Sequence, residues 1–166
     1  MGRFDINKYK VPDPSEVDMR ATKQNFELFM GAYGAVREKV GKNRMPKMTQ
    51  SFSPISATPQ REYDGDAERF LIEREIYMPE YEELDGLFWD GYTAISNPLR
   101  QDGTQRRRQI FMLRYVYGIN IQAITERTYL GKTTVVQESG VGFLQFCRAT
   151  ELLVTKNETK PLVPVD

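Results

Sequence analysis

The 166-residue sequence contains no histidine and a single cysteine, Cys147. Histidine is the commonest general base and metal ligand near neutral pH, so its absence argues against Ser-His chemistry and against most metal-dependent hydrolysis. One cysteine cannot form a disulfide within the chain, and it cannot supply the thiolates of a metal cluster. A magnesium site built from carboxylates alone remains open in principle. On balance we expect no catalytic residue and no bound metal or cofactor.

The chain also lacks a long apolar run and a signal-peptide pattern at its amino end. A membrane-spanning helix needs about 18 or more consecutive apolar residues, and no stretch approaches that length. We therefore expect a cytoplasmic protein without a membrane partner. Hydrophobic residues make up 40% of the chain, which suffices for a packed core, and the length suits one domain or two small helical modules.

The formal net charge is zero, but the charges are unevenly distributed along the chain. Residues 1–60 carry a net charge of +4, residues 61–103 carry −8, residues 104–148 carry +5 and residues 149–166 carry −1. An acidic block beside a basic one suits two different partners, nucleic acid for the basic block and a protein for the acidic one. Two solvated helix faces that partly neutralise each other explain the pattern equally well.

The amino-terminal part of the chain predicts an extended arm followed by one amphipathic helix. Pro12 and Pro14 favour an extended backbone, and Ser15 or Asp18 can cap the helix that follows. Apolar residues then recur at steps of three and four, which is the period of a helix face that packs in a core. They are Phe26, Phe29, Met30, Tyr33, Val36 and Val40.

The middle of the chain predicts a linker and two further helices. Residues 46–65 contain three prolines and many Ser, Thr and Gln residues without a sustained period, which is typical of a linker. A short helix is expected from Asp66 to Tyr77, with Pro79 ending it and opening the next one. The apolar face of that next helix consists of Tyr81, Leu84, Phe88, Tyr92 and Ile95. Glu80, Glu82, Glu83 and Asp85 load its first turns, where acidic side chains suit the helix dipole.

The basic segment at residues 104–148 predicts a helix-turn-helix. Asn97-Pro98 ends the preceding helix, and Thr104 can cap a helix whose inward residues include Ile110 and Leu113. Gly118 ends this helix, and a short helix follows at residues 121–128. A turn at Tyr129-Leu130-Gly131, which pairs an apolar plug with a glycine, leads into the final helix.

The final helix has two chemically different sides. Val135, Ser139, Gly142, Phe143 and Phe146 are spaced to face inward, so Lys132, Thr133, Val136, Gln137 and Gly140 face outward. In a helix-turn-helix the second helix enters the major groove of DNA. Gln137 could then read adenine and Val136 could pack on a thymine methyl group, while Lys132 and Thr133 suit phosphates or base acceptors.

Glu138 opposes the charge of Lys132, so several arginines are expected to supply much of the attraction to phosphates. The predicted DNA-contacting residues are Arg106, Arg107, Arg108, Arg114, Arg127, Lys132, Thr133, Thr134, Val136 and Gln137.

This segment resembles the region-4 helix-turn-helix of bacterial sigma factors. The family pattern has LRY-x-x-G, then an apolar-x-x-IAER stretch, then STV after the turn. The matching residues are Leu113-Arg114-Tyr115 with Gly118, Ile124-Thr125-Glu126-Arg127 and Thr133-Thr134-Val135. Together with the segments NKYKVPDPS and PKMTQSFSP and the helix from Phe26 to Val40, most of the chain resembles the phage-encoded ArpU-like family of late-gene transcription regulators.

Two features depart from the sigma-factor pattern. Thr125 replaces a small alanine at which the two helices pack closely, and a slightly wider crossing can absorb the change. Gly140 and Gly142 each weaken the last helix by up to about 1 kcal/mol relative to alanine, so this helix is expected to become firm only on DNA or on a partner.

The resemblance implies an all-α transcription regulator that binds double-stranded DNA in the bacterial host cell. It implies a late-gene activator that recruits RNA polymerase. Two alternatives stay open: a helix-turn-helix adaptor that binds RNA polymerase or another phage protein, and a ring-forming packaging protein of the small-terminase kind. Assembly into a homo-oligomer stays open as well.

The expected domains are an amino-terminal arm and helical module at 1–45, a linker at 46–65, a helix-turn-helix DNA-binding domain at 66–154 and a flexible tail at 155–166. We expect the carboxy-terminal domain to fold without residues 1–60.

Two enzyme-like patterns are weaker. Asp64, Asp66, Glu68 and Glu73 could form a metal site, but carboxylates at this spacing more often form a solvated helix face. Gly131-Lys132-Thr133 is similar to the end of a phosphate-binding loop, yet the upstream glycine and the preceding strand of that motif are missing.

Overall fold

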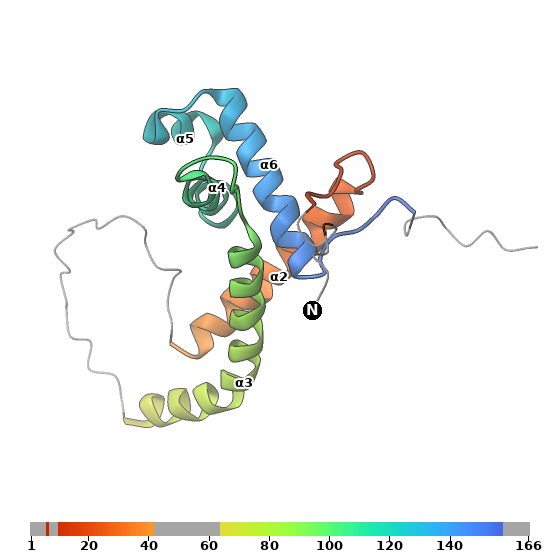
Figure 1. Cartoon of the computed structure of the whole chain (residues 1–166). Coiled ribbons are helices and arrows are strands. Elements are labelled where there is room, and N and C mark those ends of the chain that lie inside the picture. The colour runs from red at the N-terminus through yellow and green to blue at the C-terminus, as the bar shows by residue number, and fades with distance from the viewer. Residues whose placement is uncertain (1–5, 7–9, 42–63, 158–166) are drawn as a thin grey trace, which may run out of the picture. The chain divides into compact units, whose positions relative to one another are not determined.

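A computed structural model describes residue 6 and residues 10–41 and 64–157, in which helices are joined by turns and irregular segments and no strand occurs. A single isolated bridge joins Val17 to Thr155. The expected all-α class is therefore confirmed for the described part of the chain. None of its helices is both long and apolar enough to cross a lipid bilayer. The elements are α2 (Met19–Lys39), α3 (Asp64–Ala94), α4 (Gly103–Phe111), the π-helical turn η1 (Met112–Val116), α5 (Ile121–Thr128) and α6 (Lys132–Ala149), as Figure 1 shows.

The chain divides into two compact units whose boundaries fall inside α2 and α3. We call the first the helix-turn-helix unit, which combines Met1–Leu28 with Leu87–Asp166, and the other, Phe29–Gly86, the second unit. The boundaries of these units lie after residues 28 and 86, whereas the expected domain boundaries lie after residues 45, 65 and 154. The expected linker at 46–65 and the tail at 155–166 lie mostly outside the described residues.

The first turns of α2 belong to the helix-turn-helix unit because they complete its aromatic core. Phe26 is 4% exposed, and its ring centroid lies 5.3 Å from that of Phe143 and 5.5 Å from that of Phe146. The Thr22 hydroxyl accepts a hydrogen bond from the backbone nitrogen of Val154 at 3.0 Å. The expectation that the carboxy-terminal domain folds without residues 1–60 does not fit this packing, because the deletion would remove a central ring.

The second unit is organised around Tyr33, which is 1% exposed. Its ring stacks on those of Phe29 and Tyr81. The Tyr33 hydroxyl donates to Asp85 and accepts from Arg37 Nη1 at 3.0 Å. The pKa of Tyr33 is raised, mainly by burial of the hydroxyl and to a lesser extent by its hydrogen bond to Asp85. Asp85 is therefore part of this polar cluster, whereas its acidic neighbours Glu80, Glu82 and Glu83 are exposed.

The expected break at Pro79 is wrong, because α3 continues through this residue. Proline has no N–H group, so the carbonyl of Glu75 loses its helical donor. Pro79 and Glu75 are both exposed, so water can reach that carbonyl. Figure 1 shows α3 changing direction in its first half, which is what a proline inside a helix produces.

The helix-turn-helix core matches the expected inward residues. Ile110, Ile124 and Val135 are fully buried, and the partly buried side chains of Leu113, Ile119, Ile121 and Leu130 pack around them. The short helix α5 has the expected bounds because its ends carry local signals. Gly118 has a φ of 65°, and the side chain of Asn120 accepts the backbone N–H of Ala123 at 2.8 Å. These contacts fix the turn on which α6 is mounted.

The expected helix cap at Thr104 is wrong. Thr104 does not cap α4, since its hydroxyl accepts from the backbone nitrogen of Asn97 and the helix begins at Gly103. The helix α6 runs from Lys132 to Ala149 through its two glycines, and its expected firming on DNA or on a partner stays a prediction. Gly142 allows a close approach, because a Cβ there would lie 3.3 Å from Cγ of Arg107.

Candidate nucleic-acid interface

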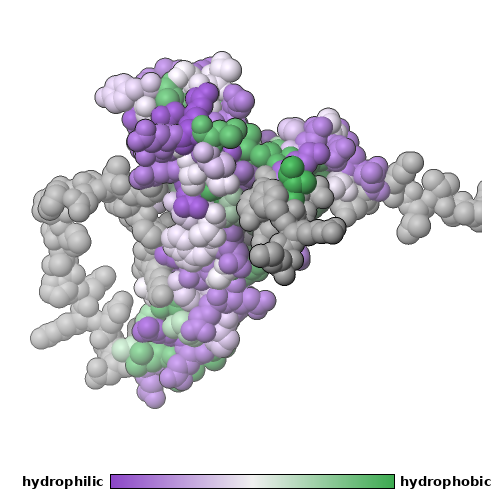
Figure 2. All heavy atoms as spheres, in the orientation of Figure 1, coloured by the Kyte–Doolittle hydropathy of each residue, from purple (hydrophilic) through white to green (hydrophobic). Residues whose placement is uncertain are grey.

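One side of α6 is exposed along its first two turns. Lys132, Thr133, Val136 and Gln137 are exposed and Thr134 is partly buried, while Val135 and Ser139 on the other side are buried. The expected division of this helix into an inner and an outer side is therefore confirmed. Figure 2 shows mostly hydrophilic side chains over α5 and the start of α6.

The beginning of α6 also offers backbone donors. Its N-cap residue is Gly131, and no side chain caps the helix there. The first backbone N–H groups of a helix have no partner within the helix, and the helix dipole places partial positive charge at this end. With Lys132 beside it, the start of α6 is electrostatically suited to a phosphate.

Arg107 does not fit the expected role of a phosphate-contacting residue. It is 8% exposed, and its Nε lies 2.7 Å from Oε2 of Glu138 in an ion pair. Its Nη2 donates to Oε1 of the same carboxylate at 3.3 Å, and its Nη1 donates to the backbone carbonyl of Ser96. Because its donors are engaged inside the protein, Arg107 joins α4 to α6 and to the residues that follow α3.

Glu138 belongs to this buried network and is not the neighbour that neutralises Lys132. Besides Arg107, its carboxylate accepts from the Asn97 side-chain amide at 3.5 Å. Further along α6, the Gln145 amide exchanges two hydrogen bonds of 3.1 Å with the backbone of Ser96. The helix α6 is therefore held at two levels against the loop between α3 and α4.

Two further arginines are also engaged within the protein. Arg108 donates to the backbone carbonyls of Ile95 and Thr93 at 3.0 and 2.8 Å, and its guanidinium lies over the ring of Tyr92. Arg114 donates to the hydroxyl of Ser139 and lies over the ring of Tyr115. Their charges still contribute to the local potential, but their donors are directed at protein atoms.

Arg106 and Arg127 remain as arginines with accessible side chains. Arg127 is exposed at the end of α5, and Arg106 is partly exposed near the start of α4. With Lys132, these two arginines are the expected DNA-contacting cations for which the described contacts show no partner within the protein. Contact of any of the ten expected residues with DNA stays a prediction.

Sequence reasoning missed the exposure of Tyr129. In the turn at residues 129–131, Leu130 is the apolar residue that packs on the core. The side chain of Tyr129 is instead 94% exposed. Tyr129 also has a positive φ of 56°. Helices often end in a residue with left-handed backbone conformation. The position of Tyr129 directly after α5 was therefore the one sequence signal that could have indicated its conformation.

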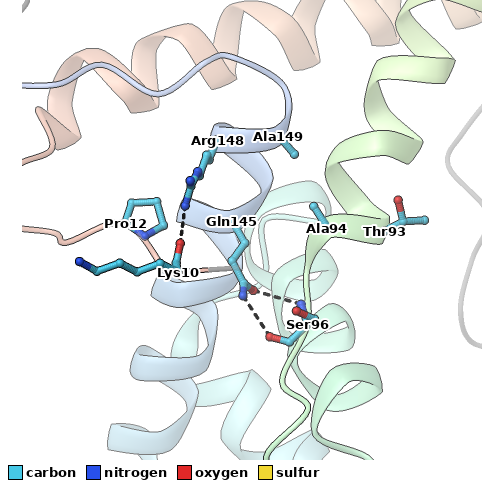
Figure 3. A pocket seen from close by; sticks show the side chains of 8 residues that line it. All are labelled: Lys10, Pro12, Thr93, Ala94, Ser96, Gln145, Arg148 and Ala149. Carbon is cyan, nitrogen blue, oxygen red and sulfur yellow. Dashed lines mark hydrogen bonds between the residues drawn. The ribbon is translucent and has the colours of Figure 1, made fainter. Parts of the chain in front are cut away.

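A cavity of about 470 Å³ lies in the same unit, away from the exposed side of α6. Figure 3 shows Arg148 and Gln145 on α6 directed toward its lining. Arg148 donates to the backbone carbonyl of Lys10, and Gln145 is paired with Ser96. Two pairs of polar groups in the lining thus bond to each other. The sequence had not indicated this cavity.

Two further kinds of reactive group, the cysteine thiol and clusters of metal-binding side chains, can be described. Burial raises the pKa of the Cys147 thiol to about 12, so the thiol stays protonated at neutral pH. No group of three or more potential metal ligands occurs among the described side chains. The side chains of Asp64 and Asp66, two of the four carboxylates considered for a metal site, lie outside the described part of the chain.

Comparison of this chain with protein-family models, with curated proteins and with solved structures finds no match.

Proposed function

We propose that this chain is a sequence-specific transcription regulator that binds double-stranded DNA by placing the start of α6 in the major groove. The observation that carries the proposal is the exposed polar side of α6, with its uncapped amino-terminal end, mounted on a well-packed three-helix core. A recognition helix needs these properties, since its first turns contact base edges while its other side holds it in place.

The exposed residues would divide into those that position the protein on the duplex and those that read its base sequence. Lys132, Arg127 and Arg106 would contact phosphates, which set the position of the protein on the duplex. Gln137 would read adenine with both atoms of its amide, and Val136 would pack on a thymine methyl group. The resemblance to sigma-factor region 4 and to ArpU-like regulators extends the proposal to a phage late-gene activator that recruits RNA polymerase in the bacterial cytoplasm.

One observation favours a second function. Three of the five expected arginines are engaged within the protein, which leaves less positive charge for DNA. The helix-turn-helix would then serve as an adaptor for RNA polymerase or another protein. Absence of duplex binding by the intact chain would favour the adaptor.

The number of phosphate contacts can be tested through salt dependence. With three cations at phosphates, the logarithm of the binding constant should fall with the logarithm of salt concentration with a slope of about −3. Lys132→Ala should make the slope shallower by about one. The control is Lys23→Ala, which removes the same charge from an exposed residue of α2 and should leave the slope unchanged. Fluorescence anisotropy on a labelled duplex measures both, and equal slopes for the two variants would remove Lys132 from the interface.

Base reading by Gln137 can be tested by comparing two DNA sequences. Gln137→Ala should reduce the preference for a selected site over a shuffled duplex by about fivefold or more, because one bidentate contact contributes about 1–3 kcal/mol of discrimination. Gln105→Ala changes an exposed glutamine on α4 and should preserve the preference. An equal loss of affinity for both duplexes would show that Gln137 does not read a base.

A further inference from the structure

Tyr129 has an unusual backbone conformation for an aromatic residue. It follows α5 with φ 56° and ψ 29°, in the left-handed region. An L-residue is disfavoured there because its Cβ approaches the following carbonyl oxygen, and glycine or asparagine adopts the conformation at least cost. Asp102 also has a positive φ, but aspartate tolerates this region through its short polar side chain.

Packing does not offset this cost. The side chain of Tyr129 is 94% exposed, and the neighbouring Leu130 supplies the apolar contact that the turn needs. A ring in water contributes almost nothing to the stability of the folded chain. A strained and exposed residue of this kind is therefore a candidate for a role in binding.

The position of Tyr129 indicates what it would bind. It lies between the last turn of α5, with exposed Arg127, and the first turn of α6, with exposed Lys132. When a helix-turn-helix docks, its first helix crosses the DNA backbone and its second enters the groove, so the turn between them lies close to phosphates and sugars. Tyrosine hydroxyls are common donors to phosphate oxygens.

We propose that Tyr129 contacts the sugar–phosphate backbone of duplex DNA at the edge of the groove that α6 enters, with its hydroxyl donating to a phosphate and its ring on the adjacent deoxyribose. The inference rests on the proposed function and adds a neutral contact to the three cations. Because the contact is made by a hydroxyl and a ring and not by a cation, it releases no counterion and leaves the salt slope unchanged.

The test compares stability and affinity in the same variants of the intact chain. Tyr129→Asn should raise the melting temperature by about 3 °C, since asparagine relieves the backbone strain. It should also weaken duplex binding about tenfold, with an unchanged salt slope. Tyr129→Phe should leave the melting temperature unchanged and weaken binding about threefold, because it removes only the hydroxyl. Leu99→Asn removes another almost fully exposed apolar side chain of the same unit and should not change binding.

The outcomes separate this inference from the proposed function. Tyr129→Asn with wild-type affinity would overturn the contact while the wild-type protein still bound DNA. A lower melting temperature together with weaker binding would assign Tyr129 a structural role and would also overturn the inference. No duplex binding by the wild-type protein would contradict the proposed function and the contact alike.

Discussion

Alanine at position 91 is expected to lower the free energy of unfolding by about 3 kcal/mol, through overpacking of a full core. A Cβ on Gly91 would lie 2.6 Å from Cδ2 and Cε2 of Phe146 and 2.7 Å from Cγ2 of Thr150. The Phe146 ring is fully buried and stacks on Phe111 with centroids 5.0 Å apart. It has little room to move, so the helix α3 would have to shift away from α6.

A glycine in the same helix provides the control for this substitution. Apart from its chain neighbours and the nearby backbone of α3 itself, no described atom lies within 4 Å of a Cβ built on Gly86. Gly86→Ala should therefore stabilise the protein by up to about 1 kcal/mol through helix propensity alone. Urea unfolding followed by circular dichroism at equal protein concentrations measures both changes. Stabilisation by Gly91→Ala similar to that by Gly86→Ala would contradict the described packing of α3 on α6.

Glu138→Gln is expected to cost about 3 kcal/mol of unfolding free energy, because it leaves the charge of Arg107 buried without its carboxylate. The ion pair is short at 2.7 Å, and the side chains of Arg107 and Glu138 are 10% and 13% exposed. The oxygen of the new amide can still accept hydrogen bonds, but its NH2 group cannot, and the amide cannot neutralise the guanidinium. Thermal and urea unfolding of the intact chain measure the loss.

The same chemical change at an exposed position is the control. Glu126 is exposed on α5 and accepts a hydrogen bond from Gln122, so Glu126→Gln should alter stability by no more than about 0.5 kcal/mol. If Glu138→Gln is as mild as Glu126→Gln, the pair with Arg107 is not the buried link between α4 and α6.

The sequence was a good guide where a local pattern determines the structure. The steps of three and four among Val135, Ser139 and Phe143 identified the buried side of α6, because a helix turns once in 3.6 residues. The bounds of α5 followed from Gly118 and from the residues of the turn. These features depend on neighbours within about one helical turn.

The sequence was a poor guide where the partner is distant along the chain. Arg107 looked like a surface cation because its partner Glu138 is 31 residues away, and charge counting does not show burial. Phe26 was assigned to a separate module because nothing local indicates that it packs on Phe143 and Phe146. The helix break expected at Pro79 was wrong for another reason. Water can form a hydrogen bond with the backbone carbonyl that loses its donor at a proline, so an exposed helix can continue through it.

The central claim, sequence-specific DNA binding through α6, is tested most directly by selecting fragments of the source genome with the purified, intact chain. We expect enrichment of a small set of fragments that share a common sequence. The best of them should bind at least about 1,000-fold more tightly than a shuffled duplex at physiological salt. Gln137→Ala should then reduce this ratio without abolishing binding to the shuffled duplex. No enrichment and no duplex binding at 50 mM salt would contradict the claim.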